Sequence, residues 1–256
     1  MIHFVEIAGR RYAQFEHLRH VAGLVHAFST RPMNVAPRDG CGAAQRAANR
    51  RTMVADWGLE ARRLCYCQQV HESHLAVVDD SRPGGPLPGC DGVITALPGR
   101  PLMTFSADCP LVLVADPVRR VLGLVHASWR CTMARMAERL VELMAARCGS
   151  GTADLRAGVG PGAGPCCYEV QRDVYEAATE LPGREQCFST RAGRLYFDLW
   201  QANRMQLVAA GVPEERIEVA GVCTLCRNDV FYSYRREGPD CGHFGLLAAL
   251  TAEPRG

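Results

Sequence analysis

The sequence contains no lysine, so each of its 29 basic residues is an arginine. Enzymes that form a Schiff base through lysine, hold pyridoxal phosphate on it, or bind phosphates with the lysine of a P-loop are therefore excluded. The arginines face 27 acidic residues, which leaves a net charge of +2. Because these charges nearly balance, they give no electrostatic reason to expect a nucleic acid or a membrane as a partner.

Long apolar runs are also missing. Stretches such as 111–115 and 121–125 have the length of strands, whereas a membrane-spanning helix needs about 20 residues. Residues 1–11 lack a charged start followed by a long apolar stretch, so we expect no secretory signal. The 13 cysteines are an odd number and cannot all pair within one chain. We therefore expect reduced thiols and a cytoplasmic location rather than a disulfide-stabilised secreted protein.

The apolar pattern predicts an α+β fold in which mixed β-sheets are sandwiched with helices. No shift in composition marks a boundary, so we expect a single domain over residues 1–256. Exposed loops are expected at 31–40 and 81–91, where proline and glycine gather. We expect strands at 25–29, 92–95, 102–105, 111–115, 121–125, 155–159, 217–222 and 230–234, and helices at 43–57, 132–147, 168–179 and 199–210.

Potential metal ligands stand beside the ends of predicted strands, in the segments 68–71, 106–110 and 125–130. Cys109 lies in a turn between two apolar strands, and His126 ends the next strand. Strands that end at the same edge of a sheet would bring them together. With His71 they would form a three-ligand zinc set whose fourth position is open to water or substrate. The alternative is that Cys109 is a small core residue, that His126 makes one structural hydrogen bond, and that Asp108 only shapes a turn.

Two further motifs each allow two interpretations. The glycine-rich segment 158–169 leads into a predicted helix, so its backbone N–H groups could cradle an anion such as phosphate, or it could be a tight turn between closely packed backbones. Cys223 and Cys226, followed by Cys241 and His243, have the spacing of a closed structural zinc site. In a chain this rich in cysteine, the same spacing can also arise by chance.

Ten short motifs occur in the order typical of one known family. The chain resembles the YfiH-like family (YfiH/FAMIN type), also called the multicopper polyphenol oxidase or laccase-domain family, over roughly residues 25–247. The motifs are HAFSTR (26–31), NRR (49–51), QQVH (68–71), CDGVIT (90–95), SADCPLVLVAD (106–116), VHASWR (125–130), GPGAGPCCYEV (160–170), FDL (197–199), CT (223–224) and FYSYRR (231–236).

This resemblance implies a CNF1/YfiH-like sandwich in which His71, Cys109 and His126 form a zinc-binding catalytic triad and Arg50 lies near the substrate. It implies activity on purine nucleosides: phosphorolysis of adenosine, inosine, guanosine and methylthioadenosine with phosphate as the second substrate, and deamination of adenosine. Some bacterial members are instead linked to the editing of peptidoglycan precursors.

The chain departs from the family pattern at two motifs, and the segment between STR and the NR helix, residues 32–40, is also unusual. The usual HAGWRG segment reads HASWRC at 126–131, and the usual TGR near the C-terminus reads CGH at 241–243. The oxidase label also conflicts with the histidine spacing, because multicopper oxidases build their copper cluster from His-x-His pairs and this chain has none. One imidazole–thiolate–imidazole set could hold a single copper adventitiously, but we expect zinc and no laccase activity.

For a zinc-dependent nucleoside enzyme, arginines are the natural phosphate clamp. Arg50 is the first candidate, followed by Arg31, Arg130 and Arg235. Asp108 would orient a ligand or relay a proton. Two other functions remain open at this level. One is a metal-free cysteine hydrolase with Cys109 as nucleophile and His126 or His71 as base. The other is a degenerate binding or scaffold protein that has lost catalysis.

Overall fold

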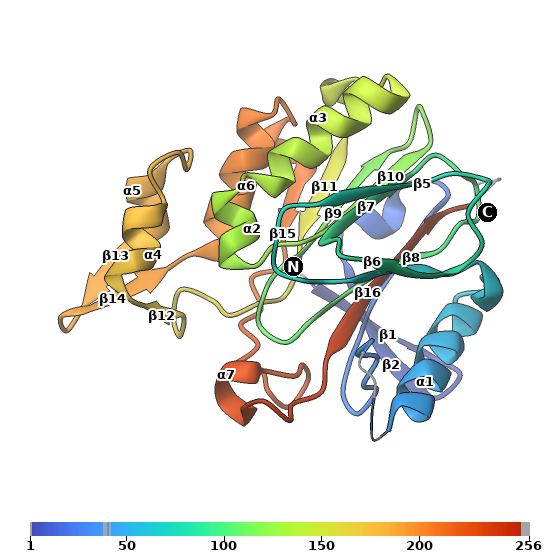
Figure 1. Ribbon diagram of the computed structural model, residues 1–256, viewed down its shortest axis with the longest axis horizontal. Helices are drawn as coiled ribbons and strands as arrows, with labels where there is room; N and C mark the ends of the chain where they lie inside the picture. Colours follow the sequence, from blue (N-terminus) through green and yellow to red (C-terminus); the bar gives the residue numbers. More distant parts are fainter. Residues whose placement is uncertain (1, 38–39, 41, 252–256) are drawn as a thin grey trace.

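Two mixed β-sheets pack face to face and carry helices on their outer faces in the computed structural model of the chain (Figure 1). The structure describes residues 2–37, 40 and 42–251. Residues 38 and 39 of the predicted loop 31–40 therefore lie outside the described residues. The α+β class, with mixed sheets sandwiched with helices, is confirmed.

The seven-stranded sheet is antiparallel except around β4, which runs parallel to both of its neighbours. In spatial order its strands are β1 (Ile2–Ile7), β2 (Arg10–Phe15), β3 (Leu24–Ser29), β16 (Phe244–Leu250), β8 (Leu102–Ser106), β4 (Cys65–Gln68) and β6 (Gly85–Pro88). The strands predicted at 25–29 and 102–105 are confirmed. The loop predicted at 81–91 is wrong in part, since it contains β6. Pro86 and Pro88 are tolerated there because β6 is an edge strand, where a missing N–H breaks no ladder.

The six-stranded sheet contains the most apolar strands. Its order is β15 (Ile217–Val219), β11 (Arg156–Val159), β9 (Leu111–Asp116), β10 (Val121–His126), β7 (Gly92–Thr95) and β5 (Leu75–Val78). The strands predicted at 92–95, 111–115, 121–125 and 155–159 are confirmed. They could be recognised in the sequence because strands of a sheet that is covered on both faces are continuous apolar runs. The strand predicted at 217–222 ends early, at Val219. The β9–β10 hairpin places Leu111 opposite His126, which brings the start of β9 and the end of β10 to one edge.

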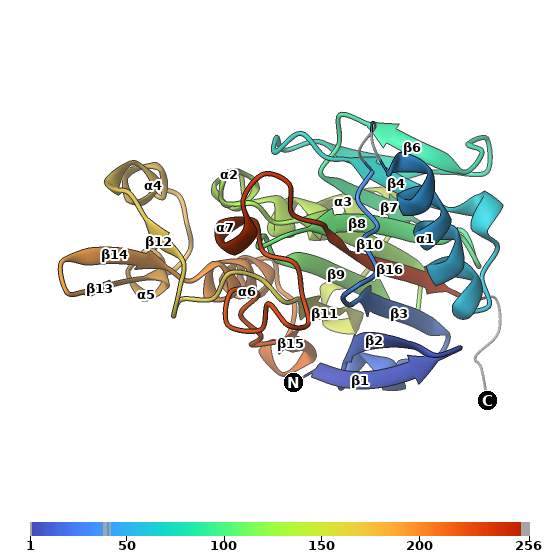
Figure 2. The same ribbon diagram turned by 90° about the horizontal axis from the view of Figure 1, so that it is seen from below.

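Helices cover the outer face of each sheet (Figures 1 and 2). The helices α3 (Met136–Cys148) and α6 (Leu199–Ala209) pack on the six-stranded sheet, and α1 (Ala43–Asp56) packs on the seven-stranded one. The helices predicted at 43–57 and 199–210 are confirmed. The helix predicted at 132–147 is confirmed over 136–147 and wrong at its start: α2 (Trp129–Met133) comes first, and the chain then turns at Arg135. Arg135 adopts a left-handed conformation with φ 55°, which ends α2 and redirects the chain into α3.

A small lobe extends from one end of the sandwich (Figure 2). It contains the three-stranded sheet β12 (Glu169–Val170), β14 (Arg194–Phe197) and β13 (Phe188–Arg191), together with α4 (Arg172–Ala177) and α5 (Arg184–Cys187). The helix predicted at 168–179 is wrong over its first residues, because Glu169 and Val170 pair with β14 instead.

The chain returns from the lobe through β15 and then forms α7 (Tyr234–Glu237). The strand predicted at 230–234 is wrong. The amide of Phe231 donates to the carbonyl of Arg227 in a turn, and the side chain of Ser233 caps α7, so this apolar segment pairs with no strand. The 3-10 helices are η1 (Leu18–His20), η2 (Ala61–Arg63), η3 (Thr152–Asp154) and η4 (Glu214–Arg216). Among the described residues, no helix combines the length and the apolar character needed to cross a bilayer.

Candidate active site and metal centre

Three side chains from different strand ends meet at one edge of the sandwich. His71 follows β4, Cys109 lies in the turn between β8 and β9, and His126 is the last residue of β10. Their ligand atoms, two imidazole nitrogens and one sulfur, all lie within 4.8 Å of one another. The two imidazole rings meet edge to face with their centroids 4.8 Å apart. The structure therefore brings together the three residues that sequence reasoning selected as a ligand set.

These side chains line a cavity of about 580 Å³, a size typical of small-molecule sites. Its wall contains both aromatic and polar side chains. Its walls are formed by Pro37, Gln68, Gln69, His71, Phe105, Ser106, Ala107, Asp108, Cys109, His126, Ser128, Trp129, Arg130, Tyr168, Tyr234, Arg235 and His243.

Asp91 holds the arrangement together, and sequence reasoning missed it. Its carboxylate Oδ1 accepts a hydrogen bond from Nδ1 of His126 at 2.9 Å. The same carboxylate accepts the backbone N–H groups of Val70, His71 and Glu72 at 2.9 to 3.2 Å. Burial by itself would raise the pKa of Asp91, but the His126 hydrogen bond and these N–H groups lower it below its usual value. With Nδ1 engaged, Nε2 is the nitrogen that His126 can offer to a cation or substrate. Asp91 stands in the CDGVIT motif directly before β7. This position at the start of a predicted strand is the feature of the sequence that could have indicated its role.

The ionisation of the site favours neutral donors. Burial, followed by electrostatic repulsion from His126, lowers the pKa of His71, which favours its neutral imidazole. Burial, followed by the nearby Asp108 carboxylate, raises the pKa of the Cys109 thiol well above its usual range. Neutral imidazoles bind divalent cations directly, and a bound cation favours loss of the thiol proton.

Asp108 lines the cavity, but both oxygens of its carboxylate already have partners. Oδ1 accepts the hydroxyl of Thr224 at 2.6 Å, and Oδ2 accepts the backbone N–H of Arg235 at 2.7 Å. Its backbone has φ 105°, an unusual value for a residue other than glycine. These contacts place Asp108 as a support that holds two other wall segments rather than as a free acid or base.

The candidate arginines separate into two groups. Arg130 and Arg235 line the cavity. Arg50 does not: its Nη1 donates to the carbonyls of Val35 and Ala36 at 3.1 and 2.8 Å, and its guanidinium lies over the Tyr66 ring. Arg31 pairs with Glu237 at 2.7 Å and is not one of the lining residues.

The glycine-rich segment 158–169 serves close packing. A Cβ at Gly158 would lie 2.5 Å from the ring of Phe15, and one at Gly162 would lie 2.8 Å from the carbonyl oxygen of Asp108. Both glycines therefore allow backbone to pass against the core, which favours the tight-turn interpretation over an anion cradle.

Cys131, which replaces a glycine of the family pattern, lies directly behind the site. Its sulfur lies within 4.8 Å of ligand atoms of Asp91 and His126. Cys131 Sγ also donates to the carbonyl of Glu72 at 2.9 Å, and burial raises the pKa of its thiol to about 12. Cys131 therefore supports the loop that carries His71 as a neutral thiol.

The second cysteine motif finds partners other than those expected. The structure groups Cys223 and Cys226 with Cys166 and Cys167. Of the two residues predicted to complete that site, Cys241 is buried elsewhere and His243 lines the cavity. The proposed C-x-x-C and C-x-H pairing is therefore wrong. Spacing along the chain cannot reveal a partner that the fold supplies from 60 residues away.

A cavity on an α+β sandwich, with two imidazoles and one thiol in its wall, has the donor set of a mononuclear metal site. The model of the multi-copper polyphenol oxidoreductase laccase family matches residues 21–251, and the chain belongs to this family. This confirms the resemblance carried by the sequence motifs. In the part of the chain that the structure describes, no group of candidate ligands contains more than two histidines.

Relatives of the chain carry names from purine metabolism. It is 35% identical over 217 residues to a protein of Geobacillus stearothermophilus named purine nucleoside phosphorylase YlmD, covering 79% of this chain and 77% of the relative. It is 31% identical over 203 residues to adenosine deaminase RL5 from an unknown prokaryotic organism, covering 75% and 77%. The crystal structure of YlmD from Geobacillus stearothermophilus superposes with a TM-score of 0.90 at 29% identity, covering 97% of this chain and 98% of the other.

Proposed function

We propose that this chain is a zinc-dependent purine nucleoside enzyme. It catalyses the phosphorolysis of adenosine, inosine, guanosine and methylthioadenosine and the deamination of adenosine, with the substrate bound in the 580 Å³ cavity. The names of the relatives supply the substrate class. The observation that carries the proposal is the convergence of His71, Cys109 and His126 on one point of the cavity wall.

The donor set fits zinc. Zinc bonds of about 2.0 Å to nitrogen and 2.3 Å to sulfur put two nitrogens and one sulfur of a tetrahedron about 3.3–3.5 Å apart. The ligand atoms of His71, Cys109 and His126, all within 4.8 Å of one another, reach that geometry through small side-chain adjustments. Three protein ligands leave one position open, and zinc bound there would supply Lewis acidity beside the substrate. Asp91 keeps His126 in the tautomer that presents Nε2.

The remaining wall residues suit a nucleoside and a phosphate. Trp129 and Tyr168 offer flat apolar surfaces to a purine ring. Arg130 and Arg235 offer guanidinium groups, which bind phosphate through paired hydrogen bonds. In phosphorolysis, a phosphate oxygen bonds to the ribose carbon C1′ while the bond from C1′ to the base nitrogen breaks. The base leaves with that electron pair and takes up a proton. In deamination, water adds its oxygen to C6 of adenine and ammonia leaves.

Asp108 and Arg50 act as positioning residues in this proposal. Asp108 holds the backbone of Arg235 and the side chain of Thr224, which sets the wall beside Cys109. Arg50 holds the carbonyls of Val35 and Ala36, directly before Pro37, which lines the cavity. Each affects the substrate through the segment that it fixes.

The state of Cys109 argues against the metal-free cysteine hydrolase. A nucleophilic cysteine needs a pKa lowered by a cationic or N–H-rich setting. Burial and the neighbouring Asp108 instead raise the pKa of Cys109. Without a cation the thiol stays protonated, so a metal-dependent reaction is favoured.

Product analysis by chromatography tests the proposal. Zinc-loaded protein is incubated with adenosine, with and without phosphate. Adenine that forms only with phosphate indicates phosphorolysis, and inosine without phosphate indicates deamination. We expect Cys109→Ala to lose at least about 10³-fold in both activities. Cys187→Ala, which removes a buried thiol of the lobe, serves as the control and keeps them. Zinc-loaded, folded protein that forms neither product, or full activity of Cys109→Ala, would refute the proposal.

A further inference from the structure

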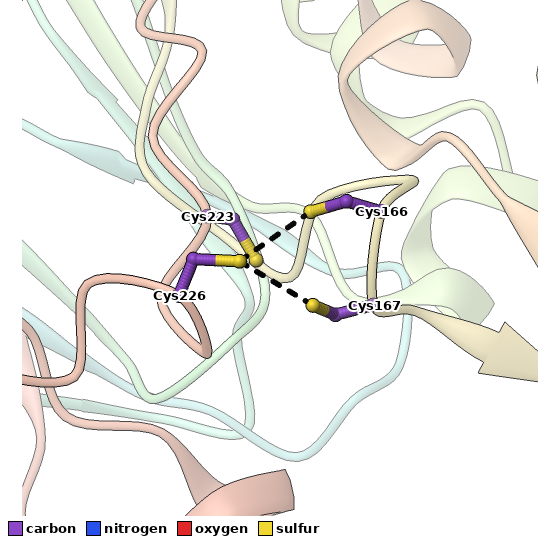
Figure 3. Close-up of side chains that lie close together, drawn as sticks. All are labelled: Cys166, Cys167, Cys223 and Cys226. Atoms are coloured by element: carbon purple, nitrogen blue, oxygen red, sulfur yellow. Dashed lines mark hydrogen bonds between the residues drawn. The ribbon is translucent and has the colours of Figure 1, made fainter.

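Four cysteines converge on a point outside the cavity lining (Figure 3). Cys166 and Cys167 lie in the loop before β12, and Cys223 and Cys226 lie in the loop after β15. All four sulfurs point toward one another and lie within 4.8 Å (Figure 3). The sulfur of Cys226 is 3.7 Å from that of Cys166 and 3.5 Å from that of Cys167. We propose that these cysteines bind one zinc ion as a closed tetrathiolate site.

The spacing of the sulfurs matches a single ion. Zinc–sulfur bonds of about 2.3 Å in a tetrahedron put sulfurs about 3.8 Å apart, close to the 3.5 and 3.7 Å between Cys226 and its two neighbours. Four sulfurs within 4.8 Å leave no room for an iron–sulfur cluster, which places several irons and sulfides between its cysteines. Tetrahedral S₄ coordination is typical of zinc. Cys226 is equally near two thiols, so no single pair is set apart as a disulfide.

The backbone around Cys223 is arranged for a thiolate. The N–H of Gly164 donates to its sulfur at 3.3 Å, across the junction of the two loops. The backbone N–H groups of Cys226 and Leu225 also approach this sulfur. Such N–H groups around a ligating sulfur orient it and stabilise its charge. This arrangement is independent of the convergence of the sulfurs and indicates the same kind of ligand.

The ion would connect the loop before β12 with the loop after β15, which are otherwise held together by non-covalent contacts. The loops already touch, because Gly162 and Cys223 form an isolated β-bridge and Thr224 N–H donates to the carbonyl of Gly162. Tyr168, directly after Cys167, lines the cavity, and Thr224 bonds to Asp108. The second site is therefore structural: it anchors the lobe to the sandwich and fixes the wall of the cavity from behind.

Metal counting on the full chain tests this inference. By elemental analysis we expect two zinc ions per chain in the unmodified protein and one in Cys109→Ala. The double variant Cys166→Ser/Cys226→Ser also keeps one, at the cavity. Cys148→Ser, which removes a half-buried thiol outside both groups, keeps two and serves as the matched control. Because the two sites are emptied by different substitutions, failure of this inference is distinguishable from failure of the proposed function.

Cobalt identifies the ligands. Co²⁺ bound to Cys109→Ala should show the intense sulfur-to-cobalt charge-transfer absorption of a four-thiolate site. The melting temperature should fall by about 5–10 °C when the double variant replaces the unmodified chain. If the double variant does not fold, Cys226→His keeps four ligands, and we expect one metal with charge-transfer intensity lower by about a quarter. A Cys109→Ala protein that holds no metal, whether its four thiols stay free to a thiol reagent or form disulfides by mass spectrometry, would overturn the inference.

Discussion

The buried carboxylate of Asp91 accepts a hydrogen bond from Nδ1 of His126 at 2.9 Å and from the backbone N–H of His71 at 3.1 Å. One side chain therefore positions two of the candidate metal ligands, which approach from different sheets. Asp91 directly precedes β7, which pairs with β10. The six-stranded sheet therefore sets the position of Asp91, independently of the loop that carries His71. The candidate site thus depends on a residue that does not itself line the cavity.

We expect Asp91→Asn to weaken zinc binding by about 10–100-fold, because such carboxylate partners raise the basicity of a ligating histidine and fix its orientation. The amide keeps the size of the side chain but loses the charge that His126 and three N–H groups share. Competition with a zinc chelator measures the change. Asp229→Asn removes an exposed carboxylate paired with Arg227 and provides the control. Equal zinc affinity in Asp91→Asn and the unmodified chain would contradict this role.

Substitution of Arg130 should affect phosphate binding, whereas substitution of Arg50 should affect stability. Arg130 lines the cavity, so Arg130→Ala should raise KM for phosphate by about 10-fold or more while deamination of adenosine changes little. Arg50→Ala leaves the carbonyls of Val35 and Ala36 without their donor, so it should cost about 1–3 kcal/mol of stability. Steady-state kinetics and urea unfolding on both variants separate the two effects. A larger rise of the phosphate KM in Arg50→Ala would instead show that this arginine contacts the substrate.

His26 should make the protein sensitive to acid. Burial lowers its pKa to about 3, although the N–H of Phe15 donates to its Nε2 at 2.9 Å. In the unfolded chain a histidine has a pKa of about 6.5. Between these values the unfolded chain binds a proton that the folded chain does not, so stability falls as the pH drops from 6.5 toward 3. At pH 4.5 the loss from this group is about 2–3 kcal/mol relative to pH 7.

Urea unfolding at pH 7 and pH 4.5 measures this difference. His26→Gln keeps an acceptor for Phe15 but cannot titrate, so it should lose less stability between the two pH values than the unmodified chain. His20→Gln, at an exposed position, should leave the difference unchanged. The same acid loss in His26→Gln and the unmodified chain would show that other groups account for it.

Asp56 ties the end of α1 to β2. Its carboxylate accepts hydrogen bonds from Nε and Nη2 of Arg10 at 2.6 and 2.7 Å and from the hydroxyl of the buried Tyr12 at 2.5 Å. We expect Asp56→Ala to lower the free energy of unfolding by about 2–4 kcal/mol, because it leaves a buried hydroxyl and a cation without their acceptor. Tyr12→Phe removes one of these bonds and should cost about 1–2 kcal/mol. Asp79→Ala, at an exposed site, is the control. Equal urea midpoints for Asp56→Ala and Asp79→Ala would contradict the prediction.

Sequence reasoning located β7, β9, β10 and β11 of the six-stranded sheet because both faces of that sheet are covered, but it missed the edge strand β5. Continuous apolar runs such as Leu111–Asp116 and Val121–His126 are visible without knowledge of their neighbours. It missed β6 and mistook the segment at 230–234 for a strand, because strand pairing depends on a partner. Gly85–Pro88 finds one in β4, and the apolar residues before α7 find none.

The candidate site also combines residues that the local sequence indicates with residues whose role depends on distant partners. His71, Cys109 and His126 were selected from motifs at strand ends, and the structure brings them together. The expected place of Arg50 near the substrate rested on the resemblance alone; in the structure its guanidinium donates to the carbonyls of Val35 and Ala36. Asp91 and Cys131 stood in recognised motifs, but nothing local showed that they support the loop of His71.

By itself, the sequence determined the fold class and the family and selected three candidate ligands, because apolar periodicity and short motifs are local properties of the chain. Only the tertiary structure decided which cysteines join Cys223 and Cys226, which arginines face the cavity and which carboxylate orients His126. These relationships link residues 35 to 60 positions apart. The order of the strands in the two sheets sets them, and no spacing along the chain encodes that order.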